Sequence, residues 1–337
     1  MCLVTKLSKP FVAKKDIVCY KYLSKRGDDY KTPYRETSVK LGQEMVADSN
    51  ETYGGEYNNF KKYGIEGGFI HATLGRKDSV DGNIVVKAII PAGTEFYVGD
   101  DAIEVCARKL FITEETFDVD NVPDSKIAIR ELFDDYFVDF FNTEDNVSVG
   151  FYRLADGTYL NPANLKDKNV SEEDIDGVVS DIHDGTIYVT SLDETSEAWC
   201  NKYRTSCKEQ IDSSNDARKD YNGEQHTKDI LERDDWEDYP AFVWVKNHQT
   251  KGIKNWHMGA MGEVNAAGCT NQFVINISLA LLDNADLITY AWLWSSSECL
   301  SNSAWGLNPS DGRVNYRYNK YGSSRVRAFA AFSSSSL

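Results

Sequence analysis

The sequence contains no long apolar run. No stretch approaches the roughly 18–20 consecutive apolar residues that a membrane helix needs. A secretory signal requires a continuous apolar segment after its basic residues, and the N-terminal residues MCLVTKLSKPFVAKKD do not provide one. We therefore expect no membrane insertion and no signal peptide.

Basic residues are scarce relative to acidic ones. The 337 residues include 37 Lys and Arg against 53 Asp and Glu, which gives a net charge of −16. General nucleic-acid binding depends on clustered cations that neutralise phosphates, so this composition argues against nucleic acid as a partner. The acidic excess is uneven, because residues 301–337 hold five basic residues against one acid. That segment carries +4 and the first 300 residues carry −20.

Motifs for metals, cofactors and common catalysts are also missing. The seven cysteines form no C-x-x-C pair, and Cys200 and Cys207, with six residues between them, lack the histidine spacing of a zinc site. We expect free, buried thiols made in a reducing cytosol. No G-x-S-x-G, P-loop or G-x-G-x-x-G motif occurs. We predict no cofactor and no metal, and His71 is either a pocket residue or a structural histidine.

One acidic run leaves a metal question open. Ser171–Gly185 holds six carboxylates and no Lys or Arg. Hard cations bind clustered oxygens, so Asp174, Asp176 and Asp181 could hold calcium, although the spacing of an EF-hand is absent. A solvated acidic loop is the alternative.

The N-terminal part of the chain has the texture of strands. The 41% hydrophobic content suffices for ordinary cores, and the length suggests two or three domains. Asp16–Tyr22 is strand-like, and Asn83–Ile90 and Ala102–Ile112, which are both rich in β-branched residues, also predict strands. We expect a small β-rich N-terminal domain over residues 1–115. A linker over 116–146 would follow, with an amphipathic helix at 124–141 capped by Asp124.

From Val147 onward, short strands alternate with turns and helices. Asp156-Gly157 and Asp184-Gly185 are hairpin turn signals. Ala241–Val245 reads as a buried strand. Helices are predicted near His226–Glu232, at Met258–Ala267 and at Thr270–Leu282, with Thr270 as the N-cap of the last. The whole chain is therefore expected to be an α+β protein, with its second folded domain over residues 147–337.

The C-terminal segment has an unusual composition. Asp311-Gly312 predicts another hairpin turn, and the stretch Asn315–Ser324 contains no aliphatic residue, so it cannot build a core. It holds three Tyr and one Arg among Asn, Ser and Gly, which is the composition of a binding surface in which Tyr gives rigid contact area and Ser and Asn give adaptable hydrogen bonds. An ordinary polar surface loop is the alternative reading.

An ordered series of residues carries a family resemblance. The series comprises Tyr239-Pro240-Ala241, Trp256, Met261-Gly262-Glu263, Trp294-Ser295-Ser296-Ser297-Glu298, Ala304-Trp305-x-Leu307-Asn308, Asp311-Gly312-x-Val314, Lys320 and Arg325-Val326-Arg327-Ala328-Phe329. It resembles the C-type-lectin-fold domain of variable proteins from diversity-generating retroelements, related to a broader sulfatase-modifying-factor-like group. The resemblance spans roughly 147–332 and is dense from Tyr239 onward. It implies a C-type-lectin-like domain whose C-terminal hairpins display variable residues.

Carried over by position, the resemblance implies two sets of site residues. The displayed, ligand-binding set is Leu293, Cys299, Leu300, Asn302, Ser303, Gly306, Asn308, Ser310, Arg313, Asn315, Tyr316, Arg317, Tyr318, Asn319, Tyr321, Gly322, Ser323 and Ser324. The packed supporting set is Trp294, Trp305, Leu307, Val314, Arg325, Val326, Arg327 and Phe329, with the two arginines anchoring loops through carboxylate or carbonyl contacts.

The identities of these residues agree with the mutational chemistry of the resembling systems. Those systems change adenines, typically in AAY codons, which cannot produce Trp, Lys, Glu, Gln or Met. Every residue of Asn315–Ser324 except Lys320 belongs to the accessible set. The inaccessible residues Trp294, Glu298, Trp305 and Lys320 fall on motif positions.

The resemblance implies a non-enzymatic, hypervariable receptor-binding protein similar to phage tail adhesins. It would be made in the host cytoplasm and carried on the virion, at the tail or tail tip. Its ligand would be a host cell-surface protein or glycan, its N-terminal domain would contact other virion or tail proteins, and it would form a homo-oligomer, with a trimer as one possibility. A cellular rather than phage origin stays open.

Two enzymatic readings and a structural one remain as alternatives. A formylglycine-generating-like activity would depend on Cys299, although the paired cysteines of those enzymes are not present. Ile90–Thr94 faintly resembles segments of ADP-ribosyltransferases, and such an activity would depend on Glu104. The third alternative is a structural virion decoration protein.

Overall fold

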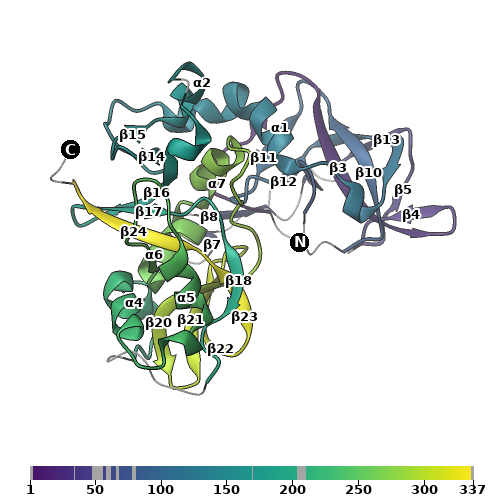
Figure 1. The fold of residues 1–337 in the computed structure, drawn as a ribbon. Helices are drawn as coiled ribbons and strands as arrows, with labels where there is room; N and C mark the ends of the chain where they lie inside the picture. The colour runs from purple at the N-terminus through teal and green to yellow at the C-terminus, as the bar shows by residue number, and fades with distance from the viewer. Residues whose placement is uncertain are drawn as a thin grey trace. The chain divides into compact units, whose positions relative to one another are not determined.

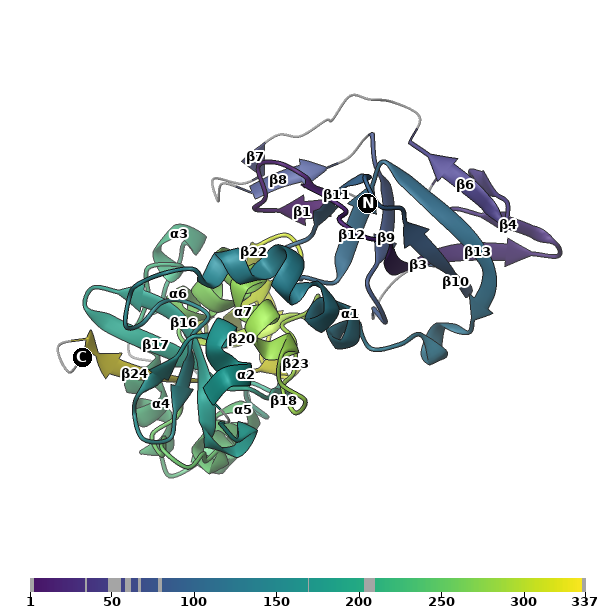
Figure 2. The same cartoon turned by 90° about the horizontal axis from the view of Figure 1, so that it is seen from above.

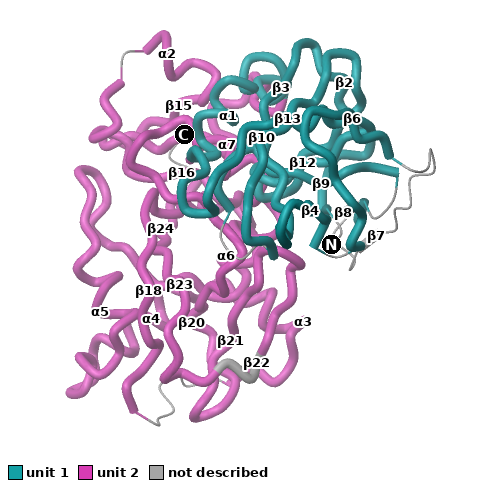
Figure 3. Tube along the Cα trace, turned by 90° about the vertical axis from the view of Figure 1, so that its right-hand side faces the viewer, with its two compact units in different colours: residues 1–139 teal, residues 140–337 magenta. Residues whose placement is uncertain are grey.

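The computed structural model describes residues 3–33, 35–47, 56–57, 62–65, 68–77, 81–168, 170–202 and 210–334. The chain divides into two compact units, Met1–Asp139 and Phe140–Leu337 (Figure 3). Both strands and helices occur, so the fold is of the mixed α+β kind. The boundary between the units falls inside the segment 116–146 that the sequence analysis assigns to a linker. Among the described residues, no helix has the length and apolarity to cross a membrane.

The first unit is built on a twisted antiparallel sheet. Along its main path the strand order is β2-β11-β12-β9-β3-β10-β13-β6, and a smaller sheet has the order β1-β8-β7 (Figure 1). The strands are β1 (Leu3–Thr5), β2 (Phe11–Val12), β3 (Ile17–Arg26), β4 (Asp29–Lys31), β5 (Ser38–Val39), β6 (Gln43–Val46), β7 (Glu56–Tyr57), β8 (Lys62–Ile65), β9 (Ile70–Thr73), β10 (Ile84–Ile90), β11 (Glu95–Val98), β12 (Glu104–Ala107) and β13 (Lys109–Phe117).

Two of the three predicted strands in this unit are confirmed, and the third is divided. β3 and β10 pair along their length, from Ile84 opposite Leu23 to Ile90 opposite Ile17. The predicted strand Ala102–Ile112 instead forms β12 and the start of β13. These two strands pair with different neighbours, β9 and β10, so the chain must break between them. Arg108 lies at the break, where its guanidinium donates to the Gly68 carbonyl at 2.6 Å.

The predicted amphipathic helix is confirmed in place but is irregular. Helix α1 (Ser125–Leu132) runs into a π-helical turn (Phe133–Phe137) and a 3-10 turn (Val138–Phe141). The Asp124 side chain accepts a hydrogen bond from the Lys126 amide at 2.9 Å, as a cap should. The π turn rotates Tyr136 and Phe137 toward the sheet, where Tyr136 lies 5.3 Å from Phe96 between ring centroids. This segment therefore covers one face of the first unit's sheet.

The second unit contains two sheets. One has the order β15-β14-β16-β17-β24-β19 and is antiparallel, and the other has the order β18-β23-β20-β21-β22 (Figures 1 and 2). The strands are β14 (Tyr152–Leu154), β15 (Tyr159–Leu160), β16 (Ile175–His183), β17 (Thr186–Thr190), β18 (Thr195–Ala198), β19 (His257–Met258), β20 (Leu293–Leu300), β21 (Ser303–Asn308), β22 (Arg313–Asn319), β23 (Ser323–Val326) and β24 (Ala328–Ser333). The hairpin at Asp184-Gly185 is confirmed, since both residues have the positive φ that such a turn requires.

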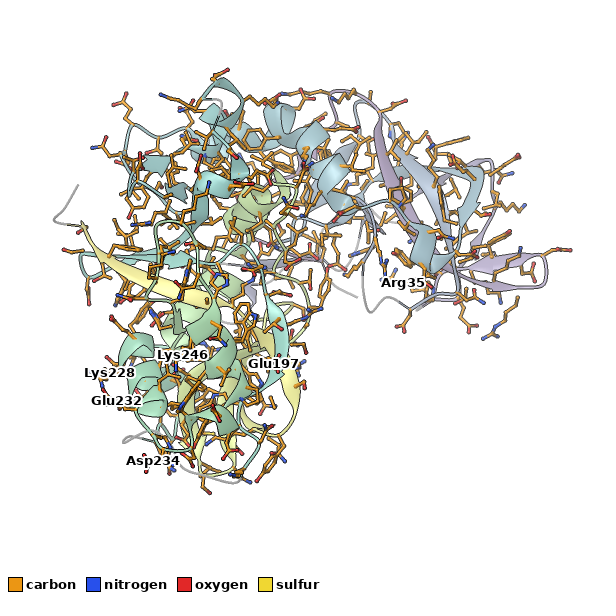
Figure 4. All side chains as sticks on the ribbon, in the orientation of Figure 1. Arg35, Glu197, Lys228, Glu232, Asp234 and Lys246 are labelled. Carbon is orange, nitrogen blue, oxygen red and sulfur yellow. The ribbon has the colours of Figure 1, made fainter. Side chains whose placement is uncertain are left out.

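Helices cover these sheets. They are α2 (Leu165–Lys168), α3 (Ser214–Ala217), α4 (Gly223–Leu231), α5 (Pro240–Asn247), α6 (Met261–Asn265) and α7 (Gln272–Ala280), with 3-10 turns at Val119–Asn121 in the first unit and at Pro162–Asn164, Glu172–Asp174 and Trp236–Asp238 in the second, and a π turn at Ala266–Thr270. The side chains of Lys228 on α4 and of Glu232, the residue that follows α4, point outward, with 3.9 Å between Nζ and Oε1 (Figure 4).

One strand prediction and one helix-cap prediction need correction. Ala241–Val245 is not a strand but part of α5, because Pro240 starts the helix with a preset φ and Ala241, Phe242 and Val245 fall on one buried helical face. Thr270 is not the N-cap of the last helix. The preceding helix continues through Thr270 as a π turn, and the residue before α7 is Asn271, which makes no side-chain cap bond.

Candidate ligand-binding surface

The C-terminal hairpins form the sheet that holds the predicted site. β20 lies between β23 and β21, and β21 pairs in turn with β22. The hairpin turn predicted at Asp311-Gly312 is confirmed: Gly312 has φ +68° and its amide donates to the Asn308 carbonyl at 2.9 Å. A second turn follows β22, closed by the Gly322 amide donating to the Asn319 carbonyl at 2.9 Å. The first turn leads into β22, an edge strand of the sheet, and the second leads from β22 into β23, which lies between β18 and β20.

Most of the displayed set is exposed or half-exposed. Leu300 is 48% exposed at the end of β20, and Tyr321 is 41% exposed in the turn after β22. The other described members with access to solvent are Asn302, Asn308, Ser310, Arg313, Asn315, Asn319, Gly322 and Ser323. For Tyr316, Arg317 and Tyr318 the strand is described but the side chains lie outside the described part of the chain.

Five predicted display positions are buried, which corrects the sequence analysis. They are Leu293, Cys299, Ser303, Gly306 and Ser324. The reason is that β20, β21 and β23, which hold these residues, each lie between two neighbouring strands of the sheet, and β20 is buried from Leu293 to Cys299. Burial also raises the pKa of the Cys299 thiol to about 11, so the reactivity that a formylglycine-generating-like mechanism needs is not supported by this environment.

The predicted supporting residues are packed as expected. Trp294, Trp305, Leu307, Val326, Arg327 and Phe329 are buried, and Val314 and Arg325 are half-buried. Both indoles are fixed by hydrogen bonds to backbone carbonyls, from Trp294 to Glu197 at 3.1 Å and from Trp305 to Ile211 at 2.9 Å. These bonds satisfy the polar edge of each ring and fix its orientation.

The two arginines anchor the sheet through one buried acid. The Glu194 carboxylate forms ion pairs with Arg325 (Nε to Oε1, 3.4 Å) and with Arg327 (Nε to Oε2, 3.1 Å). The Arg327 guanidinium also donates to the Ser191 carbonyl at 2.9 Å. Burial raises the pKa of Glu194, and the two guanidinium groups act in the opposite direction. The predicted carboxylate and carbonyl contacts are therefore present, and they join the segment after β17 to β23 and β24.

The sequence analysis did not identify a buried ion pair within this surface. Lys320 and Glu298, which it noted only as motif positions, form an ion pair in which both side chains are almost completely buried. The Lys320 ammonium also lies 4.2 Å from the centroid of the Trp199 ring. The available signal was chemical: Glu298 is the only acid in residues 292–300, and Lys320 is the only residue of 315–324 that the mutational chemistry cannot produce.

The acidic run does not gather its carboxylates into one site. Asp174 pairs with Lys251 at 2.8 Å, Asp176 pairs with Arg153 at 2.6 Å, and Asp181 accepts a hydrogen bond from the Tyr221 hydroxyl at 2.8 Å. Among the described residues, no group of three or more His, Cys, Asp or Glu side chains could hold a metal ion. The calcium hypothesis therefore has no geometric support in the described part of the chain.

Of the candidates from the sequence that lie outside the hairpins, His71 and Glu104 are half-buried in the first unit. Burial lowers the pKa of His71 to about 3, which keeps the ring neutral and favours the structural reading. Glu104 forms a buried ion pair with Lys77. Cys19, Cys106, Cys200, Cys269 and Cys299 are free and buried, as predicted, whereas Cys2 and Cys207 lie outside the described residues.

Comparisons with known proteins add little. No protein-family model matches the chain, and no curated protein matches it. Among solved structures, the chain is similar to a fimbrial protein from Bacteroides ovatus ATCC 8483, with 13% sequence identity and a TM-score of 0.46. The match covers 94% of this chain and 64% of that one. Neither the identity nor the TM-score is high enough to assign a family or a function.

Proposed function

We propose that the second unit is a non-enzymatic ligand-binding module of the diversity-generating-retroelement type, with a C-type-lectin-like arrangement of its hairpins. The observation that carries this proposal is the division of the C-terminal sheet into two sets of residues. Asn319 at the end of β22, Tyr321 in the turn after it and Ser323 at the start of β23 are exposed, whereas Trp294 on β20 and Trp305 on β21 are buried. A surface built in this way can change its contacts without changing its core.

The composition of the exposed set suits protein or glycan ligands. Tyr provides flat apolar area with few rotatable bonds, and Asn and Ser provide hydrogen bonds that adapt to different partners. The segment 301–337 carries a charge of +4 on a chain of net charge −16. The surface of this sequence variant therefore favours ligands that are anionic or that pack against aromatic rings. In the proposed setting, the ligand lies on a host cell and the protein is carried on a virion tail through its first unit.

Multiple copies would strengthen such binding. Contacts made by single exposed side chains are weak, but linked copies convert later contacts into intramolecular ones and raise the overall affinity. We include homo-oligomerisation in the proposal for this reason.

Exchange of the exposed positions tests the proposed function. Asn315, Asn319, Tyr321 and Ser323 would be replaced together by Ser, Tyr, Asn and Asn, and binding would be measured on a glycan array and on intact cells from a panel of bacterial strains. The matched control replaces Lys228 and Glu232, which are exposed on α4 and directly after it, by Gln. We expect the exchange to change the set of bound cells or glycans and the control to leave it unchanged.

Two results would count against the proposal. Unchanged binding after the exchange would show that these positions are not the binding surface, and would favour the decoration protein. Loss of the folded second unit after the exchange would show that these residues support the fold.

A further inference from the structure

Lys320 is a buried charge within the most exposed part of the proposed surface. Its neighbours Asn319 and Tyr321 are exposed, and so are Gly322 and Ser323, yet Lys320 itself is fully buried. It lies in the turn between β22 and β23. A charged ammonium group is rarely buried in a protein unless it has a partner. The burial of Lys320 between exposed neighbours therefore requires a specific set of contacts.

Those contacts reach two separate segments of the second unit. The Lys320 ammonium pairs with the Glu298 carboxylate on β20 and donates to the Ser301 carbonyl at 3.2 Å. Its backbone amide donates to the Asn302 carbonyl at 3.1 Å, and its carbonyl accepts from the Cys200 amide at 3.1 Å. The turn after β22 is thereby joined to the turn after β20 and to the segment after β18.

Trp199 connects this junction to the hydrophobic core. Its ring lies under the Lys320 ammonium, at 4.2 Å from the centroid, and packs edge-on against Phe242 at 5.0 Å between centroids. Its indole N–H donates to the Ser295 carbonyl at 2.8 Å. The position of Lys320 is therefore set by residues that belong to the core and not to the exposed positions.

A buried ion pair is a poor source of net stability, because desolvation of both charges offsets their attraction. Its better-attested role is to fix one register among several. The segment 315–324 needs such a device, since it has no aliphatic side chain with which to pack against the core. A fixed polar anchor can hold this segment whatever residues stand on either side.

We infer that Lys320, held by Glu298 and Trp199, is the positioning residue of the binding surface. It divides the displayed segment into two arms, 315–319 and 321–323, whose side chains can vary independently while the turn keeps its place. This inference rests on the proposed function for the meaning of the arms, but its test needs no ligand.

Amide hydrogen exchange on the intact chain tests the inference. The decisive protein is the double variant Lys320→Met/Glu298→Met, because each single change leaves one charge buried without its partner and is expected to fold poorly. Replacement of both charges by apolar groups is often tolerated, so the double variant should keep its tryptophan-monitored unfolding transition. We expect its amides at residues 200 and 320 to exchange at least about tenfold faster than in the wild type. Tyr321→Ala, an exposed change in the same turn, is the control and should leave both amides protected.

A second set of variants keeps Lys320 and replaces the residues on either side of it. Proteins with both arms replaced by other Ser, Asn and Tyr combinations should retain the protection of both amides, and the same proteins with Lys320→Met/Glu298→Met should lose it. Unchanged protection in the double variant, or loss of protection when only the arms are exchanged, would overturn the inference. If amide exchange gave the expected results but replacement of the exposed positions left ligand binding unchanged, the proposed function would be rejected and the inference about Lys320 would stand.

Discussion

The two units surround a buried Lys–Glu ion pair with different groups. Each contains a buried Lys–Glu ion pair, Lys77–Glu104 in the first and Lys320–Glu298 in the second. In the first unit, the pair adjoins a turn with two further buried acids, Asp100 and Asp101. Burial raises the pKa of Asp101, and burial together with the Asp101 charge raises the pKa of Glu104. The first unit therefore concentrates negative charge in its interior, and its stability should depend on pH.

The second unit uses its pair for position. Lys320 lies against the face of Trp199, and its backbone bonds join two other loops. An aromatic face attracts a cation without adding a titratable acid. The two Lys–Glu pairs therefore differ in their surroundings: Lys77–Glu104 shares its charge with neighbouring acids, whereas Lys320–Glu298 lies against an aromatic ring.

The largest expected effect separates the two pairs. Glu298→Gln leaves Lys320 buried without a carboxylate and should lower the free energy of unfolding of the second unit by about 3–5 kcal/mol. Glu104→Gln should cost the first unit less, because the Asp101 charge still acts on Lys77. All seven Trp residues lie between positions 199 and 305, so tryptophan fluorescence reports the second unit and amide exchange of β9 and β12 reports the first. Equal losses in the two units would contradict the comparison.

The next effect concerns pH and His71. Its pKa is lowered to about 3 in the folded protein from 6.5, so between these values the unfolded chain binds the proton and the folded chain does not. The first unit should therefore lose stability as the pH falls below 6.5, with a contribution from His71 of at most about 1.4 kcal/mol per pH unit. The raised pKa values of Asp101 and Glu104 act in the opposite direction, since their stabilising effect grows as the pH falls.

The variant His71→Gln isolates this contribution. As the pH is lowered from 6.5 to 4, the first unit of the wild type should lose more free energy of unfolding than that of the variant. Amide exchange in β3 and β9, corrected for intrinsic exchange rates, measures both. The tryptophan transition of the second unit serves as the internal control. A difference that stays constant with pH would show that His71 titrates while folded.

The sequence predicted local features such as strands and turns better than it predicted contacts between distant residues. Asp16–Tyr22 and Asn83–Ile90 were identifiable as strands because β-branched residues cluster in them, and Asp184-Gly185 because few other pairs accept two positive φ values. Ala241–Val245 was misread because a short apolar run has no distinguishing period, and the signal that decided it was the preceding Pro.

The contacts of the candidate surface could not be read from the chain in the same way. Glu298 and Lys320 are 22 residues apart and meet only because β20, β21 and β22 fold against one another. Whether a polar residue such as Ser303 faces solvent depends on which strands cover it, and that is a property of the sheet and not of its own sequence. Composition identified the segment, whereas topology decided which of its residues are exposed.

A smaller effect compares backbone strain in the two units. Ala102, beside the buried acids of the first unit, has φ +60°, a conformation that side chains with a Cβ rarely adopt, whereas the second unit places Gly312 at φ +68° in its hairpin turn. Ala102→Gly should stabilise the first unit by up to about 1 kcal/mol, and Gly312→Ala should destabilise the second by about 1 kcal/mol. Denaturant unfolding, followed as above for each unit, measures both. A destabilising Ala102→Gly would show that its methyl group contributes packing that outweighs the strain.

The smallest effect is expected at Tyr321, on the exposed arm next to the buried anchor. Its side chain is 41% exposed, and its amide is already held by the Asn319 side chain at 3.1 Å. Tyr321→Ser should therefore change the stability of the second unit by no more than about 0.5 kcal/mol, whereas Trp305→Ser on the buried side of the same sheet should cost at least about 3 kcal/mol. Denaturant unfolding followed by fluorescence, compared at equal m-values, measures both changes. If Tyr321→Ser cost more than 1 kcal/mol on this scale, the arm would be part of the fold, and the separation between a fixed anchor and an exchangeable surface would not hold.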